Sequence, residues 1–270
     1  MNMSIRQFFG RPAESKKPAI PPGRRVYAMG DIHGRLDLFK AAIKAIERDI
    51  EEDGADDAAS QDDFATQPQH VEPTVILLGD LIDRGPDSAG VLKRARKWKK
   101  RRDVHILGGN HEEMFLESFD KKEVLRHFLR FGGKETLQSY GIDPQAKNKA
   151  QLASLQERMA EYVPAKDLEF IRSFEEQVVI GDYAFVHAGI HPNLTLEKQD
   201  GKDLRWIREP FLSHEKLFSH VIVHGHTIYS NPEIRDNRIG IDTGAFETGR
   251  LTVLVLEGTG RKIMETSVKN

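Results

Sequence analysis

Residues 74–88 read TVILLGDLIDRGPDS, and this stretch decides the fold. The opening run, TVILL, is almost wholly apolar and rich in β-branched side chains, which favour a buried strand. Gly79 closes the run, and Asp80, Asp83 and Arg84 follow it within a few positions. A buried strand that ends in charged residues predicts functional groups at the carboxyl end of a sheet.

Two further apolar runs also end in glycine. In the segments between the three runs, apolar residues recur at helical spacing. The expected strands are residues 25–29, 74–78 and 104–107, with helices expected at 36–50 and 87–102. Strands that alternate with helices across connections of this length predict a parallel α/β sheet built from right-handed crossovers.

Together with the segments that follow, these elements predict one large domain over residues 24–260. A helical pattern over residues 112–175 predicts a helical insertion after the third strand. Strands are then expected at 177–180, 183–186, 221–223, 239–241 and 251–256.

Three segments are expected to be flexible or peripheral. Residues 1–23 are proline-rich and lack periodicity, so they predict a flexible lead-in. Residues 51–73 are acidic and lack periodicity, so they predict a mobile loop. Residues 261–270 are expected to form a C-terminal tail.

The composition excludes several classes of protein. With 40 Lys and Arg against 42 Asp and Glu, the net charge of -2 gives no general attraction to nucleic acid or anionic membranes. The absence of cysteine excludes disulfides, zinc–thiolate sites and a thiol nucleophile. Apolar runs fall short of the ~20 residues that span a bilayer, and no secretory signal is present, so a cytoplasmic location is expected. The basic run 93–102 is expected to be a solvated helix face, with docking of an acidic partner as the alternative.

Five short motifs each follow directly after an apolar run. They are GDIHG at 30–34, GDLIDRG at 79–85, GNHE at 109–112, HAG at 187–189 and HGHT at 224–227. Because loops at the carboxyl ends of strands converge in open α/β sheets, we expect these motifs to form one site.

The side chains of these motifs offer oxygen and imidazole ligands without sulfur, a set that suits Mn²⁺, Fe or Zn. Two divalent metals about 3.5–4 Å apart need a bridging carboxylate, and Asp80 in the second motif is the candidate. The remaining expected ligands are Asp31 and His33 for one metal, and Asn110, His187 and His226 for the other.

This ligand set predicts hydrolysis of a phosphate ester. Water held between two metals can lose a proton near neutral pH, and the hydroxide would attack phosphorus in line with the leaving oxygen, without a phosphoenzyme. His111, beside Asn110, is the candidate donor of a proton to the leaving alkoxide, and Asp83 would orient its imidazole. Arg84 and Arg208 offer planar forks for phosphate oxygens.

Each motif taken alone also has an ordinary interpretation. Asp31 and His33 could make loop contacts, and residues 110–112 could simply begin a helix with Glu112 facing its dipole. His224 is expected either in the core or behind the metal ligands and not as a ligand itself, and Asp242 could either support a histidine or make a turn. The order of the five motifs, each after a predicted strand, favours the shared site.

Several of these motifs resemble elements of the phosphoprotein phosphatase family of the calcineurin-like metallophosphoesterases, especially its bacterial and phage branch. The resemblance covers about residues 24–258 and includes GDIHG, GDLIDRGPDS, GNHE, HAG, HGHT, WIREPF and IDTGAFETGRLTVL. It implies a four-layer α/β/β/α metallophosphoesterase sandwich flanked by helices, with the helical insertion after the third strand. It also implies Mn²⁺ as the usual metal.

The resemblance implies the same roles for the same residues. It implies that the first metal is bound by Asp31, His33 and Asp80, and the second by Asp80, Asn110, His187 and His226. It implies that His111, with Asp83, is the general acid and that Arg84 and Arg208 bind phosphate. Many broader metallophosphoesterases have a further histidine where this chain has Ile228, a departure that fits the phosphatase branch. The acidic segment 51–73 matches no element of the family.

The expected activity is hydrolysis of a phosphomonoester, and the expected class of enzyme is a serine/threonine protein phosphatase. A dinucleoside polyphosphate hydrolase is the alternative, because relatives cleave phosphoanhydrides with nearly the same motifs. Asp83 favours the phosphatases, since symmetric dinucleotide cleavers often lack this acid. A general small-molecule phosphomonoesterase stays open. A metal-binding module without catalysis is disfavoured by the presence of His111 and Asp83.

Overall fold

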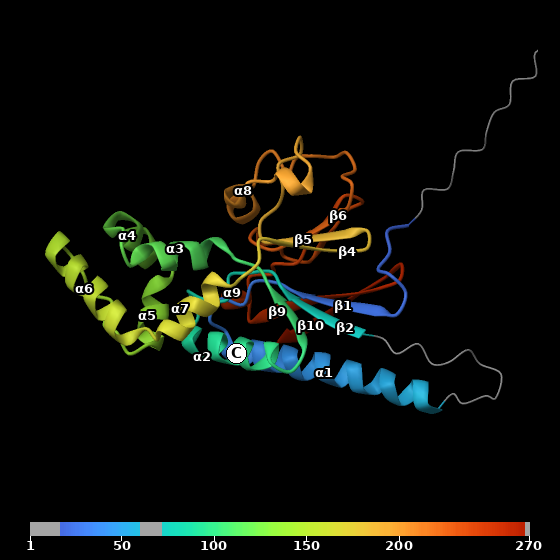
Figure 1. Ribbon diagram of the computed structural model, residues 1–270, viewed down its shortest axis with the longest axis horizontal. Helices are drawn as coiled ribbons and strands as arrows, with labels where there is room; N and C mark the ends of the chain where they lie inside the picture. Colours follow the sequence, from blue (N-terminus) through green and yellow to red (C-terminus); the bar gives the residue numbers. More distant parts are fainter. Residues whose placement is uncertain (1–16, 60–71, 268–270) are drawn as a thin grey trace, which may run out of the picture.

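The computed structural model describes residues 17–59 and 72–267, with the backbone alone for residues 53–59. Within these residues two five-stranded sheets pack face to face (Figure 1). The first sheet, in the order β10-β9-β1-β2-β3, contains β1 Arg24–Met29, β2 Glu72–Leu77, β3 Asp103–Ile106, β9 Arg250–Glu257 and β10 Gly260–Ser267. The second sheet, in the order β4-β5-β6-β8-β7, contains β4 Gln177–Ile180, β5 Tyr183–Val186, β6 Val221–His224, β7 Glu233–Ile234 and β8 Arg238–Gly240.

The strands that carry the motifs are parallel within each sheet. Met29 is level with Leu77, and Leu77 with Ile106, so β1, β2 and β3 end at the same height. In the second sheet, β5, β6 and β8 also run parallel. Parallel strands in this register deliver the loops that follow them to one edge of each sheet.

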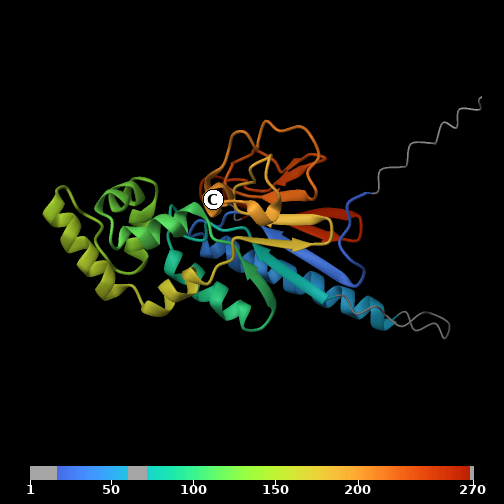
Figure 2. The same cartoon turned by 45° about the horizontal axis from the view of Figure 1, so that its top comes forward.

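Helices complete the layers. The first sheet is covered by α1 Leu36–Ala59 and α2 Ser88–Lys99, and the second by the 3₁₀ turn η1 Leu196–Lys198 and by α8 Gly201–Trp206. The insertion after β3 contains α3 Asn110–Ser118, α4 Lys122–Arg130, α5 Gly133–Ser139, α6 Lys149–Tyr162 and α7 Ala165–Arg172. It projects to one side of the sheets in both ribbon views (Figures 1 and 2). The short helix α9 Ala245–Thr248 precedes β9.

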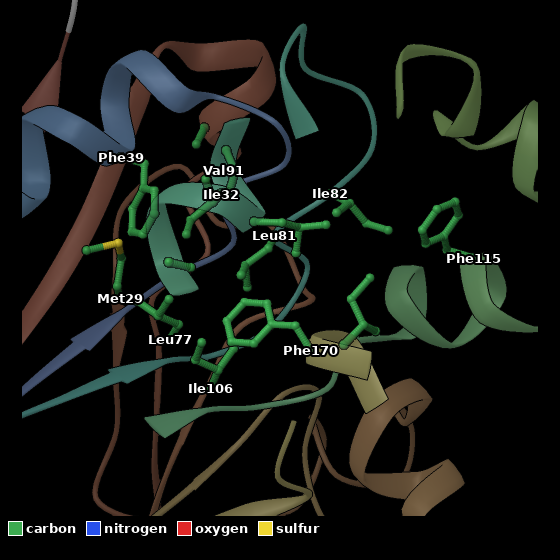
Figure 3. Packing of buried hydrophobic residues seen from close by; sticks show 14 of the residues in the cluster. Met29, Ile32, Phe39, Leu77, Leu81, Ile82, Val91, Ile106, Phe115 and Phe170 are labelled. Carbon is green, nitrogen blue, oxygen red and sulfur yellow. The ribbon is translucent and has the colours of Figure 1, made fainter. Parts of the chain in front are cut away.

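Apolar side chains fill the three interfaces between these four layers. Along β1, Tyr27 and Met29 pack against the helices, whereas Val26 and Ala28 pack between the sheets. A third cluster, which includes Phe211, lies between the second sheet and the segment around α8. Figure 3 shows the helix-side cluster. The structure thus confirms the predicted α/β/β/α fold and its helical insertion.

The predicted acidic loop over residues 51–73 was wrong at both ends. Helix α1 continues from Ile50 to Ala59, residues 60–71 lie outside the described part, and β2 begins at Glu72. The apolar stripe in the sequence stops at Ile50, but the Glu and Ala residues that follow are good helix formers, so the backbone stays helical to Ala59.

The predicted terminal segments also differ from the structure. Most of the expected C-terminal tail belongs to β10, whose polar residues pair with β9 at the edge of the first sheet. At the other end, residues 1–16 lie outside the described part, but residues 17–23 are anchored. Ile20 is buried between the sheets, and its N–H donates to the carbonyl of Gly258 at 2.8 Å. A single apolar side chain that covers the end of the sandwich leaves no periodic signal.

Among the described helices, none combines the length and the apolar character that a membrane crossing requires.

A pair of Phe→Ala substitutions tests the packing of the insertion. Phe115 is fully buried, with ring centroids 5.4 Å from those of Phe119 and Phe128, whereas Phe131 is 42% exposed. We expect Phe115→Ala to lower the free energy of unfolding by about 3–5 kcal/mol because it leaves a cavity. Phe131→Ala, the matched control, should lower it by less than about 1 kcal/mol. Urea denaturation measures both, and equal losses would contradict the assigned core.

Candidate active site

The five motif loops meet at the carboxyl ends of the strands, as expected. The N–H of His33 donates to the carbonyl of Asp80 at 2.8 Å, and that of Gly225 donates to the carbonyl of His187 at 2.8 Å. Each side chain predicted to bind metal is less than 10% exposed: Asp31, His33, Asp80, Asn110, His187 and His226. Residues from far-apart parts of the sequence therefore share one largely buried site.

Asp80 lies at the centre of this site. Its carboxylate oxygens are 3.6 Å from Nε2 of His33, 3.9 Å from Nε2 of His111 and 3.5 Å from Nε2 of His187. Among the described residues, two groups have ligand atoms within 4.8 Å of one another: His33, Asp80 and His111, and Asp80, His187 and His226. Asp80 belongs to both groups, which is the position that a bridging carboxylate requires.

The hydrogen bonds of two histidines fix which nitrogen faces the site. Nδ1 of His33 lies 2.8 Å from the carbonyl of Ile82, and Nδ1 of His187 lies 2.7 Å from that of Leu78. A carbonyl only accepts hydrogen bonds, so each Nδ1 carries the proton and each Nε2 presents a lone pair. Nε2 of His187 faces Oδ1 of Asn110 at 3.1 Å. Two acceptors that face each other at this distance fit a cation placed between them.

His226 fits the same group. Its Nδ1 lies 2.9 Å from Oδ1 of Asn110, and its buried Nε2 has no hydrogen-bond partner among the described residues. Burial and the nearby His187 lower the pKa of His226 to about 3, so the ring is neutral near pH 7. Neutral imidazole is the form that binds a metal. The donor chemistry of this group therefore fits a divalent cation.

The carboxyl groups of the site repel one another. Burial, with the charges of Asp242 and Asp80, raises the pKa of Asp31 well above its usual range. Burial likewise raises the pKa of Asp242 to about 6. Burial alone would also raise the pKa of Asp80, but the histidines around it outweigh burial and lower that pKa. A divalent cation would stabilise the ionised form of each of these acids.

Asp31 is in neither of the two groups. Its two carboxylate oxygens accept the N–H of His226 at 3.2 and 3.1 Å. A Cβ on Gly225 would overlap the Asp31 carboxylate, so glycine is required at that position. Asp31 thus joins the first motif loop to the last, and the structure places it next to the second group.

A second constellation surrounds His111. Nδ1 of His111 lies 2.6 Å from Oδ2 of Asp83, and the other oxygen of Asp83 accepts the hydroxyl of Thr136 at 2.6 Å. Burial alone would lower the pKa of His111, but the charges of Asp80 and Asp83 outweigh it and raise that pKa. Arg84 donates to Nε2 of His111 at 3.1 Å. Asp83 therefore holds one side of the ring while Arg84 contacts the other.

Arg208 reaches the site from the segment between α8 and β6. Its guanidinium donates to the carbonyl of His226 at 3.4 Å. Two neighbours fix the segment that carries it: Trp206 and Arg205 both donate to the carboxylate of Glu113 on α3, with Arg205 at 3.1 Å. Because α3 begins at Asn110, this contact joins the Arg208 segment to the loop that bears Asn110.

Backbone strain concentrates in the same loops. Positive φ angles between 44° and 72° occur, among the non-glycine residues that the structure describes, at His33, Asp80, Asp83, Arg84 and His226. Such conformations cost roughly 1–3 kcal/mol each and persist where the surrounding structure enforces them. Strain confined to the predicted site residues is typical of a functional centre.

Sequence reasoning missed two supporting residues. The buried carboxylate of Glu112 accepts the N–H groups of Gly109, Asp80 and Leu81 at 2.8–2.9 Å, and burial raises its pKa to about 8. Glu112 occupies the third helical position, where a capping acid is expected, and that signal could have revealed its role. Thr136 lies far along the insertion, where no local pattern marks it.

Two residues that the sequence left open now have a place. His224 is buried, with its ring 5.1 Å from that of Phe211, so of its two expected places it occupies the core. Asp242 accepts the N–H of Gly244 at 2.9 Å and also raises the pKa of Asp31, so it makes a turn at the edge of the site.

Two neighbouring glycines provide a test of the Asp80 geometry. A Cβ at Gly109 would overlap the Asp80 carboxylate and lie 2.7 Å from Oε2 of Glu112, whereas a Cβ at Gly108 meets nothing closer than 3.9 Å. We expect Gly109→Ala to destabilise the protein by about 1–3 kcal/mol and to abolish any rise in Tm on addition of Mn²⁺. Gly108→Ala should behave as the wild type. Identical melting curves for the two variants would show that the carboxylate is not held as described.

Comparison with known proteins gives this constellation a context. The chain is 24% identical to the asymmetrical bis(5'-nucleosyl)-tetraphosphatase PrpE of Oceanobacillus iheyensis, over 84% of this chain and 87% of the relative. It is 26% identical to serine/threonine-protein phosphatase 1 of Salmonella typhimurium, over 85% and 91%. A crystal structure provisionally described as a diadenosine tetraphosphatase shares the fold, with a TM-score of 0.60 and 19% identity over 94% of this chain and 99% of that one. The family model for calcineurin-like phosphoesterases matches residues 24–248, and the chain therefore belongs to that family.

Proposed function

We propose that the protein is a metal-dependent phosphomonoesterase that removes phosphate from serine or threonine side chains of phosphoproteins. Family membership makes it a hydrolase of phosphate esters. The observation that carries the finer proposal is the buried His111–Asp83 pair, with its 2.6 Å contact beside Asp80. This pair provides a proton donor for the leaving group.

Two divalent metals, Mn²⁺ first and Fe or Zn as alternatives, would be held by the buried ligands. The proposed sets are Asp31, His33 and Asp80 for the first metal, and Asp80, Asn110, His187 and His226 for the second. His111 also lies near Asp80, but both of its ring nitrogens already have partners, Asp83 and Arg84. His33, with Nδ1 on a carbonyl and Nε2 toward Asp80, fits the ligand role better.

Divalent metals bound at this site supply Lewis-acid activation of water and neutralise phosphate charge. The chain itself orients the substrate and supplies the proton. Arg84 in the loop after β2 and Arg208 in the segment after α8 provide guanidinium groups for phosphate oxygens. A phosphate oxygen that accepts from Arg84 releases Nε2 of His111, which then holds a proton for the leaving oxygen. Asp83 accepts a hydrogen bond from the N–H at Nδ1, which keeps its proton, and so stabilises the charged ring.

The chemistry of the leaving group connects this pair to the substrate. Serine and threonine esters release a strongly basic alkoxide, which needs a proton as the bond breaks. A phosphoanhydride releases a phosphate group that is stable without one. The hydroxyl of Thr136 donates to the Asp83 carboxylate, and the N–H of Asp83 donates to the hydroxyl of Ser88, so two hydrogen bonds hold Asp83 in place. This fixed partner for His111 supports an alkyl phosphate ester as the substrate.

A second candidate is hydrolysis of dinucleoside polyphosphates. Several relatives that are 24–27% identical over most of the chain carry the name asymmetrical bis(5'-nucleosyl)-tetraphosphatase. The same metal ligands and arginines could act on a phosphoanhydride, so the two candidates differ in how strongly they need His111.

Replacement of His111 separates these candidates. We expect His111→Asn to lower kcat/KM on a phosphoserine peptide about 10²–10⁴-fold, because the leaving alkoxide loses its proton donor. The loss on diadenosine tetraphosphate should be at least tenfold smaller. His105→Asn is the matched control, since His105 contacts Glu175 at 2.9 Å outside the site. A larger loss on the dinucleotide than on the peptide would favour the second candidate.

Removal of metal tests the proposed ligands. We expect a chelator to abolish turnover and added Mn²⁺ to restore it. Asp80→Asn, which keeps the size of the side chain, should remove most activity and the Mn²⁺-induced rise in Tm, because the bridging charge is lost. Asp103→Asn at an exposed position is the control. Full activity in the chelator would rule out the metal mechanism.

A further inference from the structure

A groove with excess positive charge lies in the helical insertion. It has a volume of about 500 Å³ and is lined by α4, α5 and the segment 143–147. Its charged lining residues are Arg126, Arg130, Lys134, Lys147 and Asp143, which we call the basic groove. Four cations against one carboxylate give it an attraction for anions.

Most of this positive charge is unpaired. Arg126 contacts Glu123 at 2.7 Å, but Arg130, Lys134 and Lys147 form no ion pair with any carboxylate that the structure describes. Elsewhere, Arg102 and Arg205 each meet a carboxylate within 2.5 Å. Arg130 lies over the ring of Phe131, 5.8 Å from its centroid, and this contact leaves its N–H groups able to bind an anionic ligand.

The basic groove is joined to the phosphate site by a short piece of chain. Gly132 lies midway between Arg130 and Lys134, and its carbonyl accepts the N–H of Arg84 at 2.9 Å. Because consecutive Cα atoms are about 3.8 Å apart, both cations have their Cα within about 8 Å of that of Gly132. The groove is therefore next to the arginine proposed to bind the reacting phosphate.

Helix α5 separates the two sites. Thr136 donates to Asp83, whereas Lys134 and Gln138 line the basic groove. Side chains two positions apart on a helix point in nearly opposite directions. The groove is therefore about one helix diameter, ~10 Å, from Asp83. A peptide that passes around α5 follows half of its circumference, ~16 Å, and an extended chain covers that path in about five residues.

We propose that the basic groove binds acidic side chains of the phosphoprotein substrate, about three to five residues from the phosphorylated position. This inference rests on the proposed phosphatase function and adds a preference for acidic sequences. The complementary charges lower KM for such substrates and leave the chemistry at the metals unchanged.

Two phosphoserine peptides of equal length test the proposal. One carries Glu, and the other Ala, at three to five positions on either side of the phosphoserine. We expect the wild type to prefer the acidic peptide by about tenfold in kcat/KM, mainly through KM. A tenfold preference corresponds to about 1.4 kcal/mol, which several exposed ion pairs can supply together. The double variant Arg130→Glu/Lys134→Glu should lose or invert the preference, while its turnover of an aryl phosphate and its Tm stay close to the wild type.

The matched control reverses two charges elsewhere. Lys93→Glu/Lys97→Glu lies on the exposed face of α2 and gives a comparable change in net charge. It should keep the preference, and loss of the preference in this variant alone would place the docking surface on α2. An unchanged preference in the Arg130/Lys134 variant, or equal wild-type rates on both peptides, would overturn the proposal but leave the phosphatase function intact.

Two further outcomes separate the alternatives. If the wild type cleaves the aryl phosphate but neither peptide, the proposed function fails and the inference fails with it. If the Arg130/Lys134 variant loses turnover of diadenosine tetraphosphate and keeps its peptide preference, the groove serves a polyphosphate chain and not an acidic peptide.

Discussion

Buried negative charge at the end of β2 is the constraint on which the rest of the site depends. Asp80 is held with a positive φ of 48°, and Oδ1 accepts the N–H of His111 at 3.1 Å. Glu112, a second buried acid, binds the N–H groups of Asp80 and Gly109. Burial raises the pKa of Glu112 to about 8, and the nearby charge of Asp80 adds to that rise. The arrangement is stable when cations and imidazoles supply compensating charge, so the loops and the metal ligands stabilise one another.

Convergence of the ligands was predictable because each of them directly follows a strand. The level register of β1, β2 and β3 turns a repeated pattern in the sequence into neighbouring positions in space. The contact of Thr136 with Asp83, 53 residues away, was not predictable, since it depends on how α5 packs and not on local spacing. The metal-ligand motifs are therefore visible in the sequence, whereas the support of the proton donor is visible only in the structure.

The errors in the predicted boundaries have a common cause. Apolar periodicity reports burial, and an exposed element carries little of it. The end of α1 beyond Ile50 lacks an apolar stripe, and β10 at the edge of its sheet is half polar, so both were interpreted as irregular. Ile20 shows the converse, because one buried side chain anchors a segment that has no pattern at all.

The division between sheets and insertion explains how one set of motifs can serve different substrates. The proposed ligands follow strand ends, so the packing between the two sheets would fix the positions of bound metals. The insertion contributes Thr136 behind the proton donor and Gly132 against Arg84, and the same helix presents Lys134 on its other face. Changes in the exposed residues of α4 and α5 would alter the groove without moving a metal ligand. Relatives named for nucleotide cleavage and for protein dephosphorylation can therefore share the five motifs, and their insertions are the place to look for what separates them.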